Sequence, residues 1–287
     1  TGLLYKTIPA NGTKTEISNF GIDTAGNIYL THVEQPAPIQ AYDKEFNKIK
    51  DIVAVATSAP KCKVISVNNY SDWPDATNGS GIQIYAGLSE SGPGIYHYRA
   101  YNFDSTFVLI DTMLKGSKDI ENITWETASK YAWVSFATDN KIQKIYLGAD
   151  QKGFPAVTDE ISSSSIGRAA GVVFGGDSAY VADYSNGKIH IFGKKPFQAF
   201  NNWRFVKQFV KNYNHGVAVT PDGNVWVCAY NQWDANHVPG SSLRSIYVLK
   251  PDGTPVDTIW SITVSGKTDT LGTAKRGLGI STDYQGN

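Results

Sequence analysis

The chain has 287 residues, and its 26 Lys and Arg balance its 26 Asp and Glu, so the formal net charge is zero. A neutral chain does not attract nucleic acid or anionic membranes by bulk charge, which excludes dedicated binders of either kind. With 41% hydrophobic residues, 27 Gly and only 18% charged residues, the composition is typical of a globular, turn-rich protein and not of a disordered one.

Hydropathy and cysteine content narrow the class of protein further. No stretch approaches the roughly 20 uninterrupted apolar residues of a membrane-spanning helix, so we expect no membrane insertion. Two cysteines are too few for a disulfide scaffold. We interpret Cys228, which lies in the apolar run 225–230, as a buried thiol, and a Cys62–Cys228 disulfide is the alternative. Four sequons, which matter only if the source glycosylates secreted chains, begin at Asn11, Asn69, Asn78 and Asn122.

The chain repeats a short cassette in which an alternating apolar strand, a polar turn with Gly and a second alternating strand follow one another. Gly26-Asn27 and Gly223-Asn224 occupy the same place in two of these turns. Each copy predicts a β-hairpin. The copies lie at residues 21–30, 171–183, 216–227 and 279–287.

Two further alternating strands belong to most of these units. Third strands are expected at residues 39–43, 141–146, 188–193 and 245–249, and fourth strands at 48–52, 107–110, 205–209 and 255–259. Helical periodicity is nearly absent. Four antiparallel strands per unit are the pattern of a propeller blade, so we predict an all-β protein with the architecture of a β-propeller.

The spacing of the units supports this architecture. They start near residues 21, 64, 123, 171, 216 and 277, and we assign them to one β-propeller domain over residues 1–287. The spacings bracket the roughly 40–50 residues of ordinary blades. Two units are longer, and we attribute their length to insertions at residues 68–81 and 231–243.

The motif at residues 216–227, with its partners that begin at residues 21 and 171, resembles the repeat of NHL-type propellers. It is also similar to the gluconolactonase-like and streptogramin-lyase-like propellers, which share this hairpin. The resemblance implies a fold superfamily. It does not select an activity, because function depends on sites that differ among proteins of one fold.

The two ends of the chain carry parts of one more unit. Residues 1–8 resemble the fourth-strand segment 252–259, and the last residues fall in the turn of a new first hairpin. We therefore expect a six-bladed ring whose last blade is incomplete in this chain. An open blade exposes unpaired strand edges. Either the chain is a fragment of a longer protein, or another chain, such as a further copy, donates strands.

Loops between second and third strands, and between fourth and first strands, converge on one face of a propeller, where sites usually lie. Imidazole binds Zn²⁺ and titrates near neutral pH, but no HxH or HExxH spacing joins the histidines here, so we predict no metal site. The expected polar rim consists of Asn19, His32, Glu34, Arg168, Asp183, Tyr184, Asn214, His215, Asn231, Trp233, Asp234, His237 and Arg276.

Candidate catalytic residues come mainly from the resemblance. The lyase-like propellers imply a His and acidic pair, for which His215 with Asp183 or Glu34 are the nearest candidates. The gluconolactonase-like propellers imply a divalent cation, but no residue set matches theirs position by position, so the cofactor is unknown. We favour the interpretation that Asp183 and Glu34 are surface carboxylates. No covalent-hydrolase, nucleotide or redox motif is present.

The tryptophans divide into two groups. Trp133 and Trp226 occupy matching positions in second strands, so we place them in the core of their blades. Aromatic residues in polar insertions are more often available to stack on sugars or to anchor a protein partner. We expect the two insertions to form the recognition surface, with Trp73, Asp75, Trp233, Asp234 and His237 as its ligand-binding residues.

Because the aromatic insertions are present and a complete catalytic constellation is not, we favour a non-catalytic binding module for a glycan or protein ligand. The low charge and the many Tyr, Asn, Thr and Ser residues fit a secreted or cell-surface protein, with the periplasm as a further option. Two alternatives stay open. One is a metal-dependent lactonase-like or lyase-like enzyme, and the other is a structural subunit of an extracellular assembly that is closed by strand donation.

Overall fold

The computed structural model describes residues 17–23, 25–32, 39–52, 61–68, 81–89, 94–100, 103–114, 120–125, 131–136, 139–146, 157–195, 203–210, 214–229, 245–259, 261–264, 267–270 and 280. Within these ranges every regular element is a β-strand, as the alternating pattern predicted. The all-β class and the blade pattern are confirmed, because the strands assemble into four-stranded antiparallel sheets.

Each blade follows chain order across its sheet. Blade 1 contains β1 (Ile17–Ile22), β2 (Ile28–His32), β3 (Ile39–Tyr42) and β4 (Lys48–Ile52). Blade 2 contains β5 (Lys61–Asn68), β6 (Ile82–Ser89), β7 (Gly94–Ala100) and β8 (Val108–Met113). Blade 3 contains β9 (Ile120–Trp125), β10 (Tyr131–Phe136), β11 (Lys141–Tyr146) and β12 (Val157–Ser162). Blade 4 contains β13 (Ala169–Gly175), β14 (Ser178–Asp183), β15 (Lys188–Lys194) and β16 (Trp203–Val210). Blade 5 contains β17 (Asn214–Val219), β18 (Val225–Ala229), β19 (Ser245–Leu249) and β20 (Pro255–Ile259).

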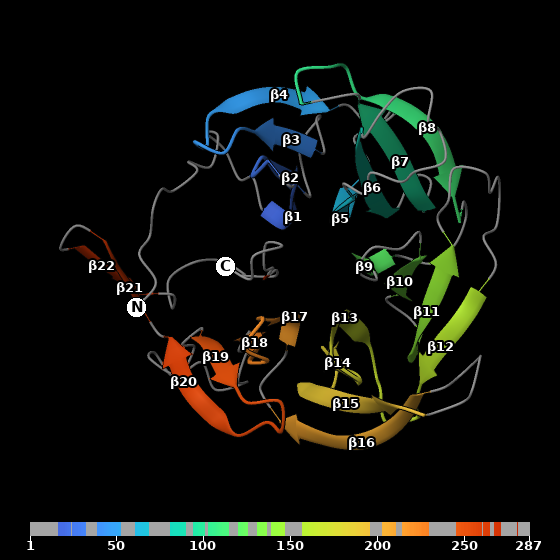
Figure 1. Ribbon diagram of the computed structural model, residues 1–287, viewed down its shortest axis with the longest axis vertical. Coiled ribbons are helices and arrows are strands. Elements are labelled where there is room, and N and C mark those ends of the chain that lie inside the picture. The colour runs from blue at the N-terminus through green and yellow to red at the C-terminus, as the bar shows by residue number, and fades with distance from the viewer. Residues whose placement is uncertain are drawn as a thin grey trace.

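The blades are arranged radially around a central axis (Figure 1). The first strand of each blade, β1, β5, β9, β13 or β17, lies nearest the centre, and the fourth strand lies at the perimeter. Successive blades contact each other through these first strands, β1 with β5, β5 with β9, β9 with β13 and β13 with β17. This radial packing buries both faces of the intervening sheets.

The described residues form five blades, and the prediction of six was wrong for this part of the chain. The segments that we assigned to the sixth blade, residues 1–8 and 277–287, lie outside the described residues apart from Ile280. After blade 5 the chain forms a separate two-stranded ribbon, β21 (Ser261–Val264) and β22 (Lys267–Thr270). A local alternating pattern can identify a strand, but it does not show whether enough partners are present to complete a blade.

The hairpin turns explain why the repeated motif folds as predicted. The Oδ1 of Asp23 accepts hydrogen bonds from the backbone N–H groups of Ala25 and Asn27, both at 2.9 Å. Gly26 closes the turn at a φ of 88°, a conformation that Gly adopts at little cost. The turn between β3 and β4 has the same backbone hydrogen bonds, but Phe46 takes this place at a φ of 64°. Its side chain packs on the apolar cluster of blade 1, which offsets the strain.

The second strands of blades 1 to 4 each carry an aromatic residue that packs toward the next blade, and Trp226 has the equivalent position in blade 5. We call the sheet face on that side the leading face, and the opposite face the trailing face. Tyr29, Tyr85, Trp133 and Tyr180 are at most 3% exposed, because each joins a cluster that includes residues of the following blade. Trp226 of blade 5 is partly exposed, so the prediction of a core position was wrong for this tryptophan.

The two cysteines are thiols and do not form a disulfide. Cys62 lies on β5 in blade 2 and is fully buried, whereas Cys228 lies on β18 in blade 5 and keeps some exposure. Burial raises the pKa of each thiol to about 12. Cys228 is a thiol in a strand, as interpreted, but it is only partly buried, and the disulfide alternative is wrong.

Candidate functional site

The two faces of the ring are defined by the direction of the first strands. Gly21, near the end of β1, packs against Val67 near the end of β5, and Gly175 at the end of β13 packs against Val219 at the end of β17. Neighbouring first strands therefore run parallel. They all begin at one face, which we call the start face, and end at the opposite face, which we call the turn face.

The two long insertions leave the ring at opposite faces. Residues 69–81 join β5 to β6, so the strand ends that bracket them lie on the turn face. Residues 230–244 join β18 to β19, so their strand ends lie on the start face. We expected one recognition surface, but antiparallel alternation within a blade separates these two connections. Trp73, Asp75, Trp233, Asp234 and His237 themselves lie outside the described residues.

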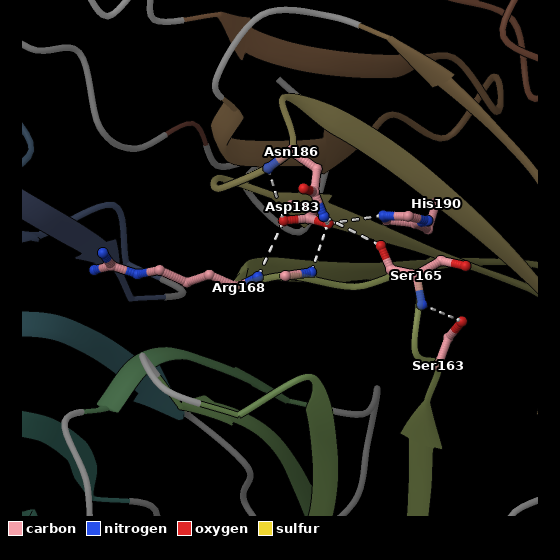
Figure 2. Close-up of polar contacts among 7 residues, drawn as sticks. Ser163, Ser165, Arg168, Asp183, Asn186 and His190 are labelled. Carbon is pink, nitrogen blue, oxygen red and sulfur yellow. Dashed lines mark hydrogen bonds and ion pairs between the residues drawn. The ribbon is translucent and has the colours of Figure 1, made fainter.

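Asp183, the last residue of β14, is fully buried below the start face, so its interpretation as a surface carboxylate was wrong. Its two oxygens accept hydrogen bonds from the backbone N–H groups of Gly167 at 2.9 Å and Arg168 at 3.0 Å. They also accept from the backbone of Asn186 at 3.2 Å, its Nδ2 at 2.8 Å and Nε2 of His190 at 3.0 Å. Figure 2 shows the carboxylate at the centre of these groups.

The hydrogen bonds also decide the charge state of Asp183. Burial alone would raise the pKa of this carboxyl, but hydrogen bonds from His190, Gly167, Arg168 and Asn186 outweigh it and hold the pKa well below its usual range. The carboxylate is therefore ionised at neutral pH, and both of its oxygens accept hydrogen bonds from the protein. Its hydrogen bonds link the connection between β12 and β13 to the connection between β14 and β15. Because the side chain is fully buried, its oxygens are not available to solvent.

Arg168 is the group that this network positions at the start face. Its backbone is held at both ends, because its N–H donates to Asp183 and its carbonyl accepts from the N–H of Tyr184 at 3.0 Å. The guanidinium lies 5.1 Å from the centroid of the Tyr184 ring, and Nη2 lies 2.5 Å from Oε1 of Glu121 at the start of β9. The pair joins blade 4 to blade 3 near the axis. Since Glu121 neutralises Arg168, the arrangement stabilises the rim and does not create a strong anion site.

The remaining candidate residues are only partly covered by the structure. His215 lies on β17, close to the start face, but its side chain is outside the described part. Glu34 lies outside the described residues altogether. The structure therefore brings together three of the expected rim residues, Arg168, Asp183 and Tyr184.

Sequence reasoning missed two buried histidines on third strands. His190 on β15 donates to Asp183, and its Nδ1 is buried without a hydrogen-bond partner within the described structure. His97 on β7 stacks on the ring of Tyr85 with centroids 4.3 Å apart, and its Nε2 lies 2.6 Å from Oε1 of Gln83. Both histidines alternate with apolar residues inside strands, and this pattern is the sequence signal for a histidine in the core of a blade.

His97 should make the protein less stable in mild acid. Burial, with a smaller contribution from the charge of Arg99, lowers the pKa of His97 from 6.5 to about 4. The unfolded chain then binds a proton between these two values and the folded chain does not, so stability is complete above pH 6.5 and falls as the pH is lowered toward 4. The loss is at most about 3.5 kcal/mol, because the two pKa values differ by about 2.5 and each pH unit contributes about 1.4 kcal/mol.

Urea unfolding at several pH values checks this expectation. His97→Gln removes the titrating group and keeps a polar side chain, so its free energy of unfolding should depend less steeply on pH between 6.5 and 4. An unchanged slope in the variant would show that other groups carry the acid sensitivity.

Two further features of the described ranges bear on function. They contain no group of three or more His, Cys, Asp or Glu side chains arranged to hold a metal ion. In the same ranges there is no helix long and apolar enough to cross a membrane.

Comparisons with known proteins agree on the architecture. No family model and no curated protein matches the sequence. A protein of unknown function from Bacteroides caccae is similar in structure, with a TM-score of 0.60 and 10% identity over 94% of this chain and 87% of that chain. The Cps50 (Swd1) β-propeller domain of Myceliophteria thermophila has a TM-score of 0.57 and 12% identity over 87% of this chain and 74% of that one. A nidogen/laminin complex contains a chain with a TM-score of 0.57 and 11% identity, over 85% and 79% of the two chains.

At these low identities the comparisons show the fold alone. Together with the radial four-stranded sheets, they show that the protein has a β-propeller fold.

Proposed function

We propose that this protein is a non-catalytic binding module of the NHL-repeat type, secreted or displayed at the cell surface, that recognises a glycan or a protein through its two insertions. The proposal extends to residues 68–81 and 231–243, which carry Trp73, Asp75, Trp233, Asp234 and His237. Because the strand ends next to the insertions lie on opposite faces, each insertion would act as a separate contact surface.

The state of Asp183 is the observation that supports a binding role most directly. A general base needs a lone pair within reach of the substrate proton, and a metal ligand needs one directed at the ion. Asp183 accepts five hydrogen bonds from its own chain and is 0% exposed. Asp183, one of the two acidic candidates for pairing with His215, therefore has a structural role, and Glu34 is the acidic partner that a lyase-like enzyme would have to use.

Binding of the protein to an immobilised panel of oligosaccharides, with and without EDTA, tests the proposal. We expect binding that EDTA does not change and that either Trp73→Ala or Trp233→Ala weakens by about tenfold or more, the usual effect of losing an aromatic anchor. Since the two insertions start on opposite faces, one of these variants should affect a given ligand and the other should not.

The unaffected variant then serves as the matched control for folding and surface chemistry. Loss of binding in EDTA, together with turnover of a lactone or glycoside substrate, would overturn the proposal and favour the metal-dependent enzyme instead.

A further inference from the structure

Asn186 and Gly187 are neighbours in the turn between β14 and β15, beside the buried carboxylate of Asp183. In an Asn-Gly pair the backbone nitrogen of the glycine can attack the side-chain amide of the asparagine, because glycine has no Cβ to hinder the approach. Asn186 is exposed, and Gly187 adopts a φ of 60°. The pair therefore has the chemistry of a deamidation site.

The folded turn engages the amide of Asn186 in other contacts. Its Nδ2 donates to Oδ2 of Asp183 at 2.8 Å and to the backbone carbonyl of Ser165 at 3.2 Å. The backbone N–H of Asn186 donates to Oδ1 of Asp183 at 3.2 Å. Figure 2 shows the amide turned toward Asp183. An attack on Cγ of Asn186 by the nitrogen of Gly187 therefore requires the amide to leave both of its acceptors.

Gly167 packs against the same amide from the connection between β12 and β13. A Cβ at this position would lie 2.8 Å from Nδ2 and 3.3 Å from Cγ of Asn186, and the first of these distances is closer than real Cβ atoms approach. The glycine therefore leaves just enough room for the amide to reach Asp183. The connection is itself held in place, because the N–H groups of Gly167 and Arg168 donate to Asp183.

We propose that Asn186 is a deamidation site that the Asp183 network keeps closed, and that deamidation prevents this network from forming again. When the turn opens, the backbone nitrogen of Gly187 bonds to Cγ of Asn186, and the Cγ–Nδ2 bond breaks. The side-chain nitrogen leaves as ammonia with the proton of the Gly187 N–H, and a succinimide ring remains. Water then opens the ring to an aspartate or an isoaspartate, so the reaction needs neither an enzyme nor an oxidant.

The product reverses the electrostatics of the turn. Its new carboxylate would take the place of the amide that donates to Asp183 at 2.8 Å, and an ionised carboxylate has no hydrogen to donate. Two carboxylates at hydrogen-bonding distance do not both stay ionised, so the folded state raises the pKa of one of them. A raised pKa makes the fold less stable as the pH rises above the unfolded value of about 4. The contribution of Asp183 in the parent protein is lost in the opposite direction, as the pH falls.

Peptide mapping by mass spectrometry measures the reaction in the full chain, incubated at pH 8 with and without urea. In urea the network is absent and Asn186 should deamidate at its intrinsic rate. The folded chain should react more slowly by about tenfold or more, since only the locally open fraction reacts.

Gly167→Ala tests the gate without removing the charge of Asp183. The added methyl group displaces the amide of Asn186, so the variant should deamidate about tenfold faster than the folded parent protein. Gly193→Ala is the matched control, because it makes the same change on β15 of the same blade, against Val206, and it should leave the rate unchanged.

Asn186→Asp reproduces the product, and Asn186→Ser loses the same amide hydrogen bonds without adding a charge. Urea unfolding of both variants at pH 4 and pH 8 compares them. Between these values the equilibrium constant for unfolding should rise about tenfold or more for the Asp variant relative to the Ser variant. The reason is that each unit by which the pKa is raised contributes a factor of about ten.

Three results would overturn the proposal. Equal rates for Asn186 with and without urea would show that the network does not gate the reaction. An unchanged rate in a folded Gly167→Ala protein would show that the contacts of the amide do not protect it. An equal pH dependence of the Asp and Ser variants would show that the new carboxylate does not disturb Asp183.

Hydrogen exchange replaces the second comparison if Gly167→Ala does not fold. In the parent protein, at urea concentrations below the unfolding transition, deamidation of Asn186 should rise together with exchange of the Gly167 and Arg168 N–H groups, which donate to Asp183. Deamidation that does not follow this exchange would contradict the gate. None of these measurements involves Trp73 or Trp233, so the deamidation site and the proposed function can fail separately.

Discussion

Asp183→Asn should lower the free energy of unfolding by about 3–5 kcal/mol, the usual cost of breaking a buried charged network by removing one partner. The amide has one acceptor oxygen in place of two, and its NH₂ group would face the N–H donors of Gly167, Arg168 or Asn186. At least one buried donor would lose its acceptor, which costs the desolvation of that group. Urea unfolding of the variant and the parent protein at pH 7 measures the difference.

Asp177→Asn is the matched control for this change. Asp177 lies in the exposed turn of the same blade, between β13 and β14, so its substitution should change stability by less than about 0.5 kcal/mol. The pH dependence provides a second check. Because the pKa of Asp183 is depressed in the fold, its contribution is complete above the unfolded value of about 4 and is lost as the pH falls further. A similar loss for both variants would contradict the structural role of the network.

Trp133→Ala should destabilise the protein by about 3–5 kcal/mol, whereas Trp226→Ala should cost less than half of that. The two residues occupy equivalent places in blades 3 and 5, but Trp133 is 1% exposed and packs on Phe174 and Trp203. Trp226 has no described blade in front of it and already contacts solvent, so less apolar area returns to water when it is truncated. Thermal and urea unfolding of both variants checks the difference.

This pair of variants carries its own control, since the residue type, the substitution and the strand position are the same. Equal destabilisation would mean that the leading face of blade 5 is as well covered as that of blade 3.

The strands of the fold could be predicted because their signals are local. The motif that begins at Gly216 needs only an alternation of apolar residues and a turn with Gly at a positive φ, and Gly223 has a φ of 83°. The predicted third strand 188–193 corresponds to β15 (Lys188–Lys194), and the predicted fourth strand 255–259 corresponds to β20 (Pro255–Ile259). Such signals depend on residues that are close along the chain, so they can be recognised without knowledge of the tertiary fold.

The candidate site could be predicted only in part, because its contacts join distant strands. The sequence placed Arg168, Asp183 and Tyr184 near one rim, and the structure brings them together. It did not predict that Asp183 is buried, since two of the five donors to this carboxylate are backbone N–H groups 15 and 16 residues away, and the others come from Asn186 and His190 beyond the next turn. Backbone donors leave no trace in the sequence, so a buried acceptor looks like a surface carboxylate.

The sequence by itself determined the all-β class, the hairpin repeat and the absence of bulk charge, because each depends on composition or on residues close along the chain. Only the tertiary structure decided how many blades the described residues complete, which faces carry the two insertions, and which leading-face aromatic stays partly exposed. These properties depend on which strands run parallel and which blades are neighbours. They follow from long-range packing, which no local pattern encodes.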